Sequence, residues 1–310
     1  MNNRTLAEER IIKLPAEARV GPPILRVKDL DRVLAFYRDV LGLQVKRPGQ
    51  DQESVELGFG EQIGKFGSAA SDPLLVLKYD PSAKENPRSS SGLYHFAILV
   101  PDRKSLGHAY SAIEKSRQVH FDGFGDHLVS ESLYLHDPEH NGIEIYRDRP
   151  RSEWPRDKEG RIMMDTLALD LPAILDESSR DEQETSSAFP YGARIGHMHL
   201  RVTNLERSVK FYHEKLGLDI VLNLSSMAAA FLSAGGYHHH IGLNTWHTLD
   251  GKHHEPSEAG LDTFTIEVPA GNTPLRQLRS QLESALLPET RERELWVSDP
   301  DGIPIRIRFI

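Results

Sequence analysis

Two histidines and one glutamate interrupt segments of this chain that otherwise carry the apolar residues typical of strands. His95 lies in LYHFAIL, His197 in IGHMHLRV, and Glu144 between two isoleucines in GIEIY. Because successive strand residues point to opposite faces, Glu144 faces a cavity if its isoleucine neighbours face the core. A carboxylate buried there needs a positive partner. Such side chains could together ligate a metal ion, although a single strand histidine is more often an ordinary interior or surface residue.

A run of three histidines within YHHHIGLNTW, at residues 237–246, is the other concentration of imidazoles. A solvated loop is one interpretation. The apolar residues that follow, beginning with Ile241, favour a strand instead, in which His239 would lie on the face opposite to His238 and His240. The histidines of the polar stretches are expected at the surface and without a role: His108, His120, His136, His140, His253 and His254.

The elements that must position these residues repeat along the chain. Residues 24–45 and 199–220 match without a gap, and both read as a short strand, a polar turn and an amphipathic helix that buries Phe-Tyr and ends at Leu-Gly. Residues 92–101 and 260–269 match in the same way. The pattern predicts four units of one strand, one helix and several further strands, and therefore an α+β fold. We number these units one to four, at residues 21–80, 91–148, 194–246 and 259–310.

The four units group into two predicted domains, residues 21–150 and 193–310. Residues 1–20 are expected to form an N-terminal tail. The intervening residues 151–192 are rich in proline, serine and charge, which predicts a linker, with one short helix near 166–176. A chain of 310 residues is long enough to bury a core in each domain.

Composition excludes several classes of function. The formal net charge of −9 and the lack of a long Lys/Arg run argue against nucleic acid or anionic lipid as a partner. The absence of cysteine excludes disulfides, thiolate metal sites and cysteine nucleophiles. No apolar run approaches the ~20 residues of a bilayer span, and the N-terminus lacks the apolar stretch of a signal peptide. We expect a cytoplasmic protein without membrane or nucleic-acid partners. The H-E-x-x-H motif of many zinc hydrolases is also absent.

Several stretches resemble the vicinal oxygen chelate superfamily, which includes glyoxalases, bleomycin and fosfomycin resistance proteins and type I extradiol dioxygenases. GLYHFAILVP, DHLVSESLYLHDPEHNGIEIYRDRP, IGHMHLRV and LSAGGYHHHIGLNTW look most similar to catechol 2,3-dioxygenase-like members. The resemblance covers about residues 21–310, except parts of the predicted linker. It implies βαβββ modules that pair into half-open barrels around a metal ion.

The resemblance also implies roles for individual residues. Extradiol members hold Fe(II), or less often Mn(II), with two histidines and one glutamate. The residues that match these ligands are His95, His197 and Glu144. His239 matches the acid/base histidine of the family, and Tyr134, three residues before an Asp-Pro turn, matches its active-site tyrosine. His127, in GDHLVS, lies where a further active-site histidine is often found.

One departure bears on the architecture. In many two-domain extradiol enzymes all three ligands come from modules three and four, but module four here has Thr263 and Arg306 at those places. The ligand set is complete only if module two pairs with module three. The resemblance therefore implies an exchanged pairing, two with three and one with four, that gives two half-open barrels of which only one holds metal.

The activity that the resemblance implies is extradiol ring cleavage, in which O2 is inserted into a catechol-type diol to give a muconic semialdehyde-type product. The partners would be a small aromatic diol and O2, and we expect a homo-oligomer. There are two alternatives. A glyoxalase-type isomerase or thiol transferase usually needs a second carboxylate where this chain has His239. A metal-free binding or resistance protein lacks the ligand set that this chain carries.

Overall fold

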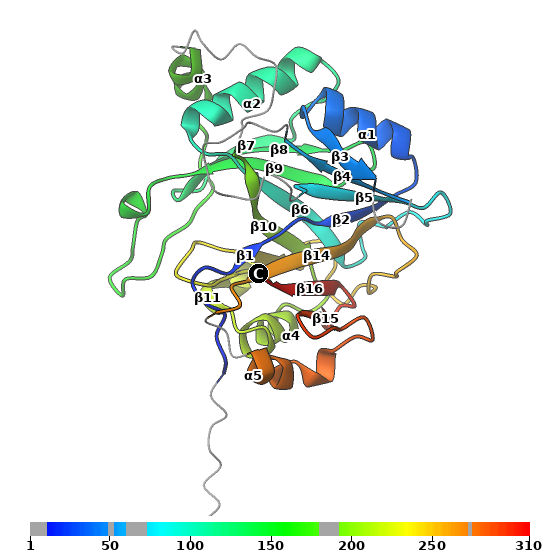
Figure 1. Cartoon of the computed structure of the whole chain (residues 1–310). Coiled ribbons are helices and arrows are strands. Elements are labelled where there is room, and N and C mark those ends of the chain that lie inside the picture. Colours follow the sequence, from blue (N-terminus) through cyan, green and yellow to red (C-terminus); the bar gives the residue numbers. More distant parts are fainter. Residues whose placement is uncertain (1–10, 49–52, 60–72, 180–191, 272–274) are drawn as a thin grey trace, which may run out of the picture.

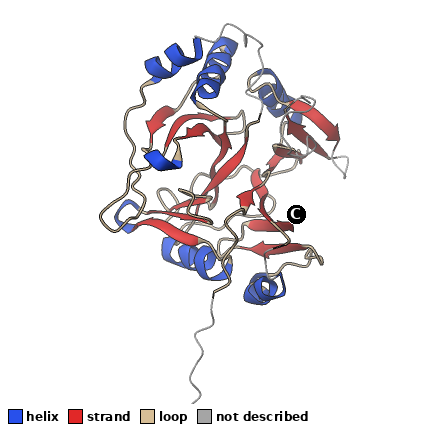
Figure 2. Ribbon diagram, turned by 60° about the vertical axis from the view of Figure 1, so that its left-hand side comes forward, coloured by secondary structure: helices blue, strands red, loops and turns tan. Residues whose placement is uncertain are grey.

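Two curved eight-stranded sheets build the protein, and each takes strands from both halves of the chain (Figure 1 and Figure 2). The helices lie on the outside, with α1 and α2 towards one end and α4 and α5 towards the other. This is the α+β architecture that the sequence predicts. The computed structural model describes residues 11–48, 53–59, 73–179, 192–271 and 275–310.

The first sheet, called the site sheet below, has the strand order β11-β12-β13-β10-β6-β9-β8-β7. Unit two supplies β6 (Gly92–Leu99), β7 (Gly123–Asp126), β8 (Ser130–His136) and β9 (Gly142–Asp148). Unit three supplies β10 (Arg194–Arg201), β11 (Asp219–Leu224), β12 (Ala229–Ser233) and β13 (Ile241–Asn244). The two units meet where β6 pairs with β10 in antiparallel fashion.

The second sheet has the order β15-β16-β14-β2-β5-β4-β3, and β1 also pairs with β14. Units one and four meet where β2 pairs antiparallel with β14. The exchanged pairing expected from the sequence is therefore confirmed. The strands are β1 (Arg19–Val20), β2 (Ile24–Val27), β3 (Gln44–Pro48), β4 (Ser54–Gly58), β5 (Leu75–Tyr79), β14 (Gly260–Val268), β15 (Glu294–Ser298) and β16 (Pro304–Phe309).

In the described parts of the chain, five α-helices cover the sheets: α1 (Leu30–Asp39), α2 (Arg103–Ser116), α3 (Leu171–Ser179), α4 (Leu205–Lys210) and α5 (Leu275–Gln281). A short π-helix, Phe211–Lys215, continues α4. Short 3-10 helices occupy Arg151–Glu153, Ser225–Met227 and Glu283–Ala285. The two copies of the sequence repeat begin their helices alike. Asp29 accepts a hydrogen bond from the backbone of Arg32, and Asn204 accepts one from that of Arg207, so both act as N-caps.

The Phe-Tyr pair of each repeat is buried, as the sequence predicts, and its tyrosine also bonds to a distant turn. The hydroxyl of Tyr37 donates to Asp137 at 3.1 Å, and that of Tyr212 donates to Asp299 at 3.0 Å. These aspartates belong to the Asp-Pro turns of units two and four. Because Tyr37 packs with the second sheet and Asp137 with the site sheet, each bond ties one sheet to the other.

The segments outside the four units also pack against the sheets. Leu14, Ala18 and Val20 are buried, and the amide of Leu14 donates to the carbonyl of Gly217 at 3.0 Å. After β9, Trp154 is buried in a cluster with Val129 and Tyr237. The helix predicted near 166–176 is α3, which packs against α2. The division of the chain into domains at 21–150 and 193–310 stays a prediction.

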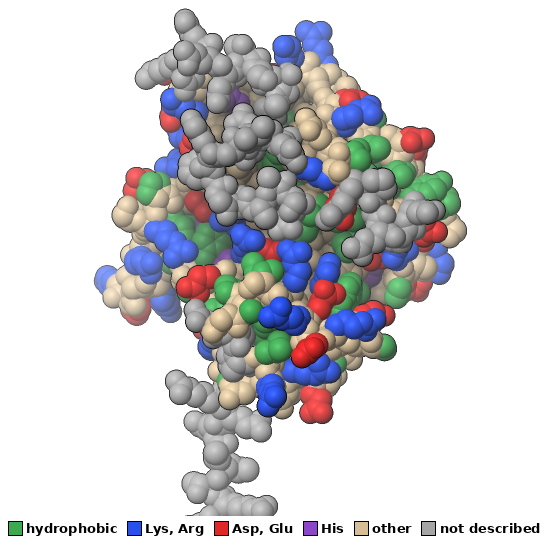
Figure 3. All heavy atoms as spheres, viewed as in Figure 1, with side chains coloured by type: hydrophobic (Ala, Val, Ile, Leu, Met, Phe, Trp, Pro, Cys, Tyr) green, Lys and Arg blue, Asp and Glu red, His purple; other side chains and the backbone are tan. Residues whose placement is uncertain are grey.

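The surface carries both signs of charge. In the view of Figure 3, lysine and arginine side chains are interspersed with aspartate and glutamate. Among the described residues, no helix is both long enough and apolar enough to cross a membrane.

Candidate metal centre

Two histidines and one glutamate of the site sheet converge on one point. Nε2 of His95 and Nε2 of His197 each lie 2.9 Å from Oε2 of Glu144, and the two nitrogens are 3.4 Å apart. All three side chains are buried. They come from three neighbouring strands, β6, β10 and β9, and thus from units two and three, as the sequence predicts.

Strand register explains why these residues meet. Glu144 of β9 pairs with Ala97 of β6, two residues beyond His95, and His197 of β10 pairs with that same Ala97 from the other side. β10 has an irregularity beside His197. Gly196 occupies it, and a Cβ atom there would lie only 1.8 Å from the hydroxyl of Tyr146. Glycine is therefore required for β10 to bring His197 against the neighbouring strand.

The three atoms fit a single metal ion. Ligand atoms at ~2.1 Å from one ion and at right angles to each other are about 3 Å apart, which matches the three separations above. Two imidazoles and one carboxylate on one side of an ion leave its other positions open, as in the facial triad of non-haem Fe(II) oxygenases. The hydroxyl of Ser132 donates to Oε1 of Glu144 at 2.6 Å, which leaves Oε2 as the free ligand atom.

The protonation states of the site suit a cation. Burial alone would raise the pKa of Glu144, but the interactions with His197 and His95 outweigh it and hold this pKa well below its usual range. Burial lowers the pKa of His197 to about 4, against the opposing effect of Glu144. An ionised carboxylate and a neutral imidazole are the forms that metal binding requires.

The histidine run is placed differently from the sequence-based expectation. β13 begins only at Ile241, so residues 237–240 form a loop and not a strand. Strand alternation therefore does not apply, and His238 and His239 are both buried. His239 lines the cavity described below, with its ring centroid 4.0 Å from that of His197. His240 instead bonds to the hydroxyl of Ser233 at 3.0 Å.

A hydrogen-bonded chain fixes the orientation of His239. Nε2 of His238 lies 2.8 Å from Oδ1 of Asp148, and Nδ1 of His238 lies 2.8 Å from Nδ1 of His239. Asp148 only accepts, so it selects the tautomer of His238 with hydrogen on Nε2. A neutral His238 then accepts through Nδ1, and His239 must donate through its own Nδ1. Nε2 of His239 is left unprotonated and available as a base.

Tyr134 and His127 form a second hydrogen-bonded pair. The hydroxyl of Tyr134 lies 2.6 Å from Nε2 of His127, whose Nδ1 lies 2.9 Å from the backbone carbonyl of Asp165. A carbonyl only accepts, so His127 donates through Nδ1 and accepts from the tyrosine through Nε2. Burial, with the nearby charge of Glu144, raises the pKa of Tyr134 well above its usual value, so the phenol stays protonated.

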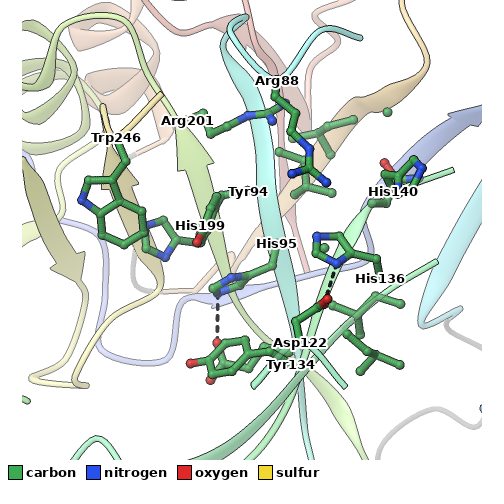
Figure 4. Close-up of a pocket in the computed structure, with 18 of the residues that line it drawn as sticks. Arg88, Tyr94, His95, Asp122, Tyr134, His136, His140, His199, Arg201 and Trp246 are labelled. Atoms are coloured by element: carbon green, nitrogen blue, oxygen red, sulfur yellow. Dashed lines mark ion pairs between the residues drawn. The ribbon is translucent and has the colours of Figure 1, made fainter. Parts of the chain in front are cut away.

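One cavity of about 1210 Å³ joins these groups. Its lining includes His95, Glu144, His239, Tyr134 and His127. The structure thus brings all the residues singled out in the sequence into one place, apart from His197, which lies directly behind its wall. Several residues of the lining are labelled in Figure 4.

His199 is the main cavity residue that the sequence analysis missed. It follows His197 by two positions on β10 and therefore shares its face, so strand alternation alone would have found it. Its ring lies 4.9 Å from that of His95, and its Nε2 is 3.1 Å from the side-chain nitrogen of Asn244. Burial lowers the pKa of His199 well below its usual value, with a further contribution from His95.

Among the histidines expected at the surface without a role, His254 needs correction, whereas His140 is exposed as expected. His254 is buried, and its Nδ1 lies 3.3 Å from a carboxylate oxygen of Glu258. His136 and His140 line the outer part of the cavity, and His136 forms an ion-pair contact of 2.5 Å with Asp122.

The corresponding place in the second sheet lacks ligands. Among the described residues, the single group of three or more histidine and acidic side chains close enough to share an ion is the one in the site sheet. Arg306 of β16 instead contacts Glu294 at 2.6 Å and lies over the ring of Trp296.

Replacing Arg306 with glutamine should therefore leave the metal content unchanged. Loss of the contact with Glu294 should lower the free energy of unfolding by about 1 kcal/mol or less, since this pair is partly exposed. Elemental analysis and thermal unfolding of the purified variant measure both quantities. Metal loss without unfolding would show that unit four shares the metal site.

Comparisons with known proteins agree with this geometry. The pattern of the Glyoxalase/Bleomycin resistance protein/Dioxygenase superfamily matches residues 19–145 and 194–307. A catechol-2,3-dioxygenase of Bacillus subtilis (strain 168) is 44% identical over 255 residues, which are 82% of this chain and 84% of the relative.

Two solved structures share the fold at low sequence identity. A putative dioxygenase from Bacillus subtilis has a TM-score of 0.61 at 14% identity and covers 96% of this chain and 86% of its own. Glyoxalase I from Zea mays has a TM-score of 0.53 at 18% identity, with coverage of 94% and 92%. The family match extends over most of the chain, and the protein therefore belongs to the Glyoxalase/Bleomycin resistance protein/Dioxygenase superfamily.

Proposed function

We propose that this protein is an extradiol dioxygenase, which uses a metal ion and O2 to open the ring of a catechol-type diol. The convergence of His95, Glu144 and His197 at the wall of one cavity carries the proposal. The 44% identity to a catechol-2,3-dioxygenase over most of both chains supports it.

The three convergent residues would hold the ion, which we propose to be Fe(II), with Mn(II) as the alternative. When bound, such an ion offers adjacent open positions for the two diol oxygens and for O2, together with a route for electrons between them. The single carboxylate, fixed through Ser132, contributes the one negative charge of the ligand set.

His239 would act as the acid/base group. Its unprotonated Nε2 can take a proton from a diol hydroxyl and return it later in the reaction. Burial lowers the pKa of His239 well below its usual value, with His197 adding to the effect, so the imidazole is neutral before substrate binds. Asp148 and His238 hold it in the required tautomer.

Tyr134 would hold a substrate oxygen. Its ring lies 5.6 Å from that of the ligand His95, and its hydroxyl is anchored by His127. Because its hydrogen goes to His127, the hydroxyl can accept a hydrogen bond from the substrate while His127 keeps it in place. Phe231 and Trp246 supply apolar wall for an aromatic ring.

The glyoxalase alternative has less support in this site. Within the described part of the chain, no second carboxylate joins the group of His95, Glu144 and His197. The position where that chemistry needs a carboxylate is held by His239.

Metal reconstitution and a diol panel test the proposal. The protein is purified without oxygen, stripped of metal, and reloaded with Fe(II), Mn(II) or Zn(II). We expect O2 uptake and a ring-opened product from a catechol with Fe(II) or Mn(II), and neither with Zn(II) or without metal. Isomerisation of a glutathione–methylglyoxal adduct, without O2 uptake on any diol, would contradict the proposal.

A further inference from the structure

The guanidinium group of Arg201 faces the cavity without a carboxylate partner. Arg201 follows His199 by two residues on β10 and so shares the face of the site residues. It is partly buried, and its Nη2 donates to Oδ1 of Asn86 at 3.0 Å. Its Nε is buried and has no hydrogen-bond partner in the described structure.

Other shielded arginines of this protein have a carboxylate partner, although Arg26 shares the unpartnered Nε. Arg147 contacts Glu131 at 2.6 Å, and Arg26 contacts Asp80 at 3.0 Å. Of the described carboxylates, none comes within ion-pair distance of Arg201. The nearest acidic influence is Glu258, which is engaged with Asn86, at 3.2 Å, and with His254. A shielded cation without a counter-charge is costly, and an anionic ligand would remove that cost.

A second arginine adds positive charge to the same part of the cavity. Arg88 lines it, and Figure 4 shows its side chain beside that of Arg201. Burial and the nearby charge of Arg88 both lower the pKa of Arg201. Two adjacent guanidinium groups repel each other, so an anion between them would be attracted by both.

The acidic residues of the cavity lining do not cancel this charge. Asp122 pairs with His136, and the carboxylate of Glu139 accepts hydrogen bonds from the backbone amides of Lys28 and Asp29. Of the acids that line the cavity, Asp122 and Glu139 therefore already have partners, whereas Glu85 is exposed, where solvent screens its charge.

A cluster of three aromatic rings lines the cavity next to the proposed metal ligand His95. The ring of Tyr94 is 5.1 Å from that of His199 and 5.2 Å from that of Trp246, and His199 is next to His95. Arg201 is four residues along the strand from His197, a span of ~13 Å between Cα atoms, and its guanidinium lies beside Gly92 and Asn86. This is the scale of one aromatic ring with a short substituent.

We propose that Arg201, with Arg88, binds a carboxylate carried by the substrate, so that the preferred substrate is an aromatic diol with a short acidic side chain. This inference rests on the proposed dioxygenase function. Arginine can meet a carboxylate with two parallel hydrogen bonds, which orients the substrate as well as attracting it. The arginines would then hold the far end of the ring while its diol meets the metal.

Two substrates of equal size test the inference. 3,4-Dihydroxyphenylacetate carries the charge, and 3,4-dihydroxyphenylacetamide replaces it with a neutral amide. A hydrogen-bonded pair with a charged group corresponds to about 10- to 100-fold, so we expect the wild type to favour the acid in kcat/KM by that factor. Arg201→Met should lower kcat/KM for the acid to that of the amide and change the amide less than about threefold.

Further variants distinguish the effect of losing the charge from the effect of damaging the fold. Arg201→Lys keeps the charge and should retain part of the preference. Arg88→Met alters an exposed side chain that the fold does not need, and should lose a smaller part. Arg38→Met is the control, because Arg38 is exposed, pairs with the neighbouring Asp39 and lies outside the cavity lining. Equal kcat/KM values for the two wild-type substrates, or a ratio unchanged in Arg201→Met and Arg88→Met, would overturn the inference.

A binding measurement distinguishes failure of the inference from failure of the proposed function. Phenylacetate and phenylacetamide have no diol, so calorimetry on metal-free protein reports the carboxylate site alone. We expect phenylacetate to bind more tightly than the amide, and Arg201→Met to abolish the difference. If no diol is cleaved but this result holds, the anion site stands and the dioxygenase proposal fails. If diols are cleaved but neither assay depends on the charge of the ligand, the dioxygenase proposal stands and the anion-site inference fails.

Discussion

Glu144→Ala should bind metal more than about 100-fold more weakly and lose ring cleavage, yet remain folded. Loss of an outer partner of a metal ligand already costs about 10- to 100-fold in affinity, and this change removes a ligand itself. It also removes the sole carboxylate of the group, leaving two imidazoles. The metal-free variant should unfold somewhat earlier than the metal-free wild type, because the contacts of Glu144 with Ser132, His95 and His197 are lost.

Metal content, O2 uptake and thermal unfolding with and without Fe(II) measure these effects. Ser132→Ala provides an intermediate case, because it removes only the hydrogen bond to Oε1. Glu294→Gln is a control in the second sheet. Full metal occupancy in Glu144→Ala would show that other residues hold the ion.

His239→Gln should keep its metal and still bind a diol, but turn over ~10²–10⁴-fold more slowly, which is the range for a positioned acid/base group. Glutamine can still occupy the place and bond to His238, but it cannot take up a proton. Single-turnover kinetics under O2, with diol binding measured without oxygen, separates binding from chemistry.

The hydrogen bonds from Asp148 through His238 to His239 can be tested separately. Asp148→Asn should slow turnover less than His239→Gln, and the two changes together should be no worse than His239→Gln alone, because Asp148 acts through that imidazole. Asp148 also accepts from the hydroxyl of Tyr237, so Tyr237→Phe is the matched control for that bond. Loss of metal in His239→Gln would instead make His239 a fourth ligand and favour a glyoxalase-type site.

Periodic patterns made much of the structure predictable. The matched repeats predicted four units, and the resemblance to the vicinal oxygen chelate superfamily, with candidate ligands in units two and three, implied which units share a sheet. Strand alternation placed Glu144 on the face opposite to its isoleucine neighbours, and the structure has it there. The same rule places His199 and Arg201, two and four residues past His197, on the face of the site. Their residue types alone did not single them out in the sequence.

The features that were not predicted depend on long-range contacts or on local turns. Residues 237–240 resemble a strand in composition, but Gly235 and Gly236 before them have φ angles of 63° and 65°, so the chain turns there instead. His254 lies in a polar stretch, and its burial results from a bond between its amide and the hydroxyl of Ser91. No periodicity in the sequence reveals such a contact.

The exchange of modules between the sheets has a consequence for how the chain folds as it is made. The two strands that join within the site sheet carry residues 102 positions apart, and the ion pair between Arg26 and Asp262 in the second sheet spans 236 positions. The N-terminal half is synthesised first. Each of β2 and β6 therefore keeps one unpaired edge until β14 and β10 have been synthesised. Pairings this distant in sequence close slowly, because the loop entropy is lost before the contacts form. Acquisition of the native state should therefore depend on completion of the whole chain, with the first half alone exposing two strand edges prone to association.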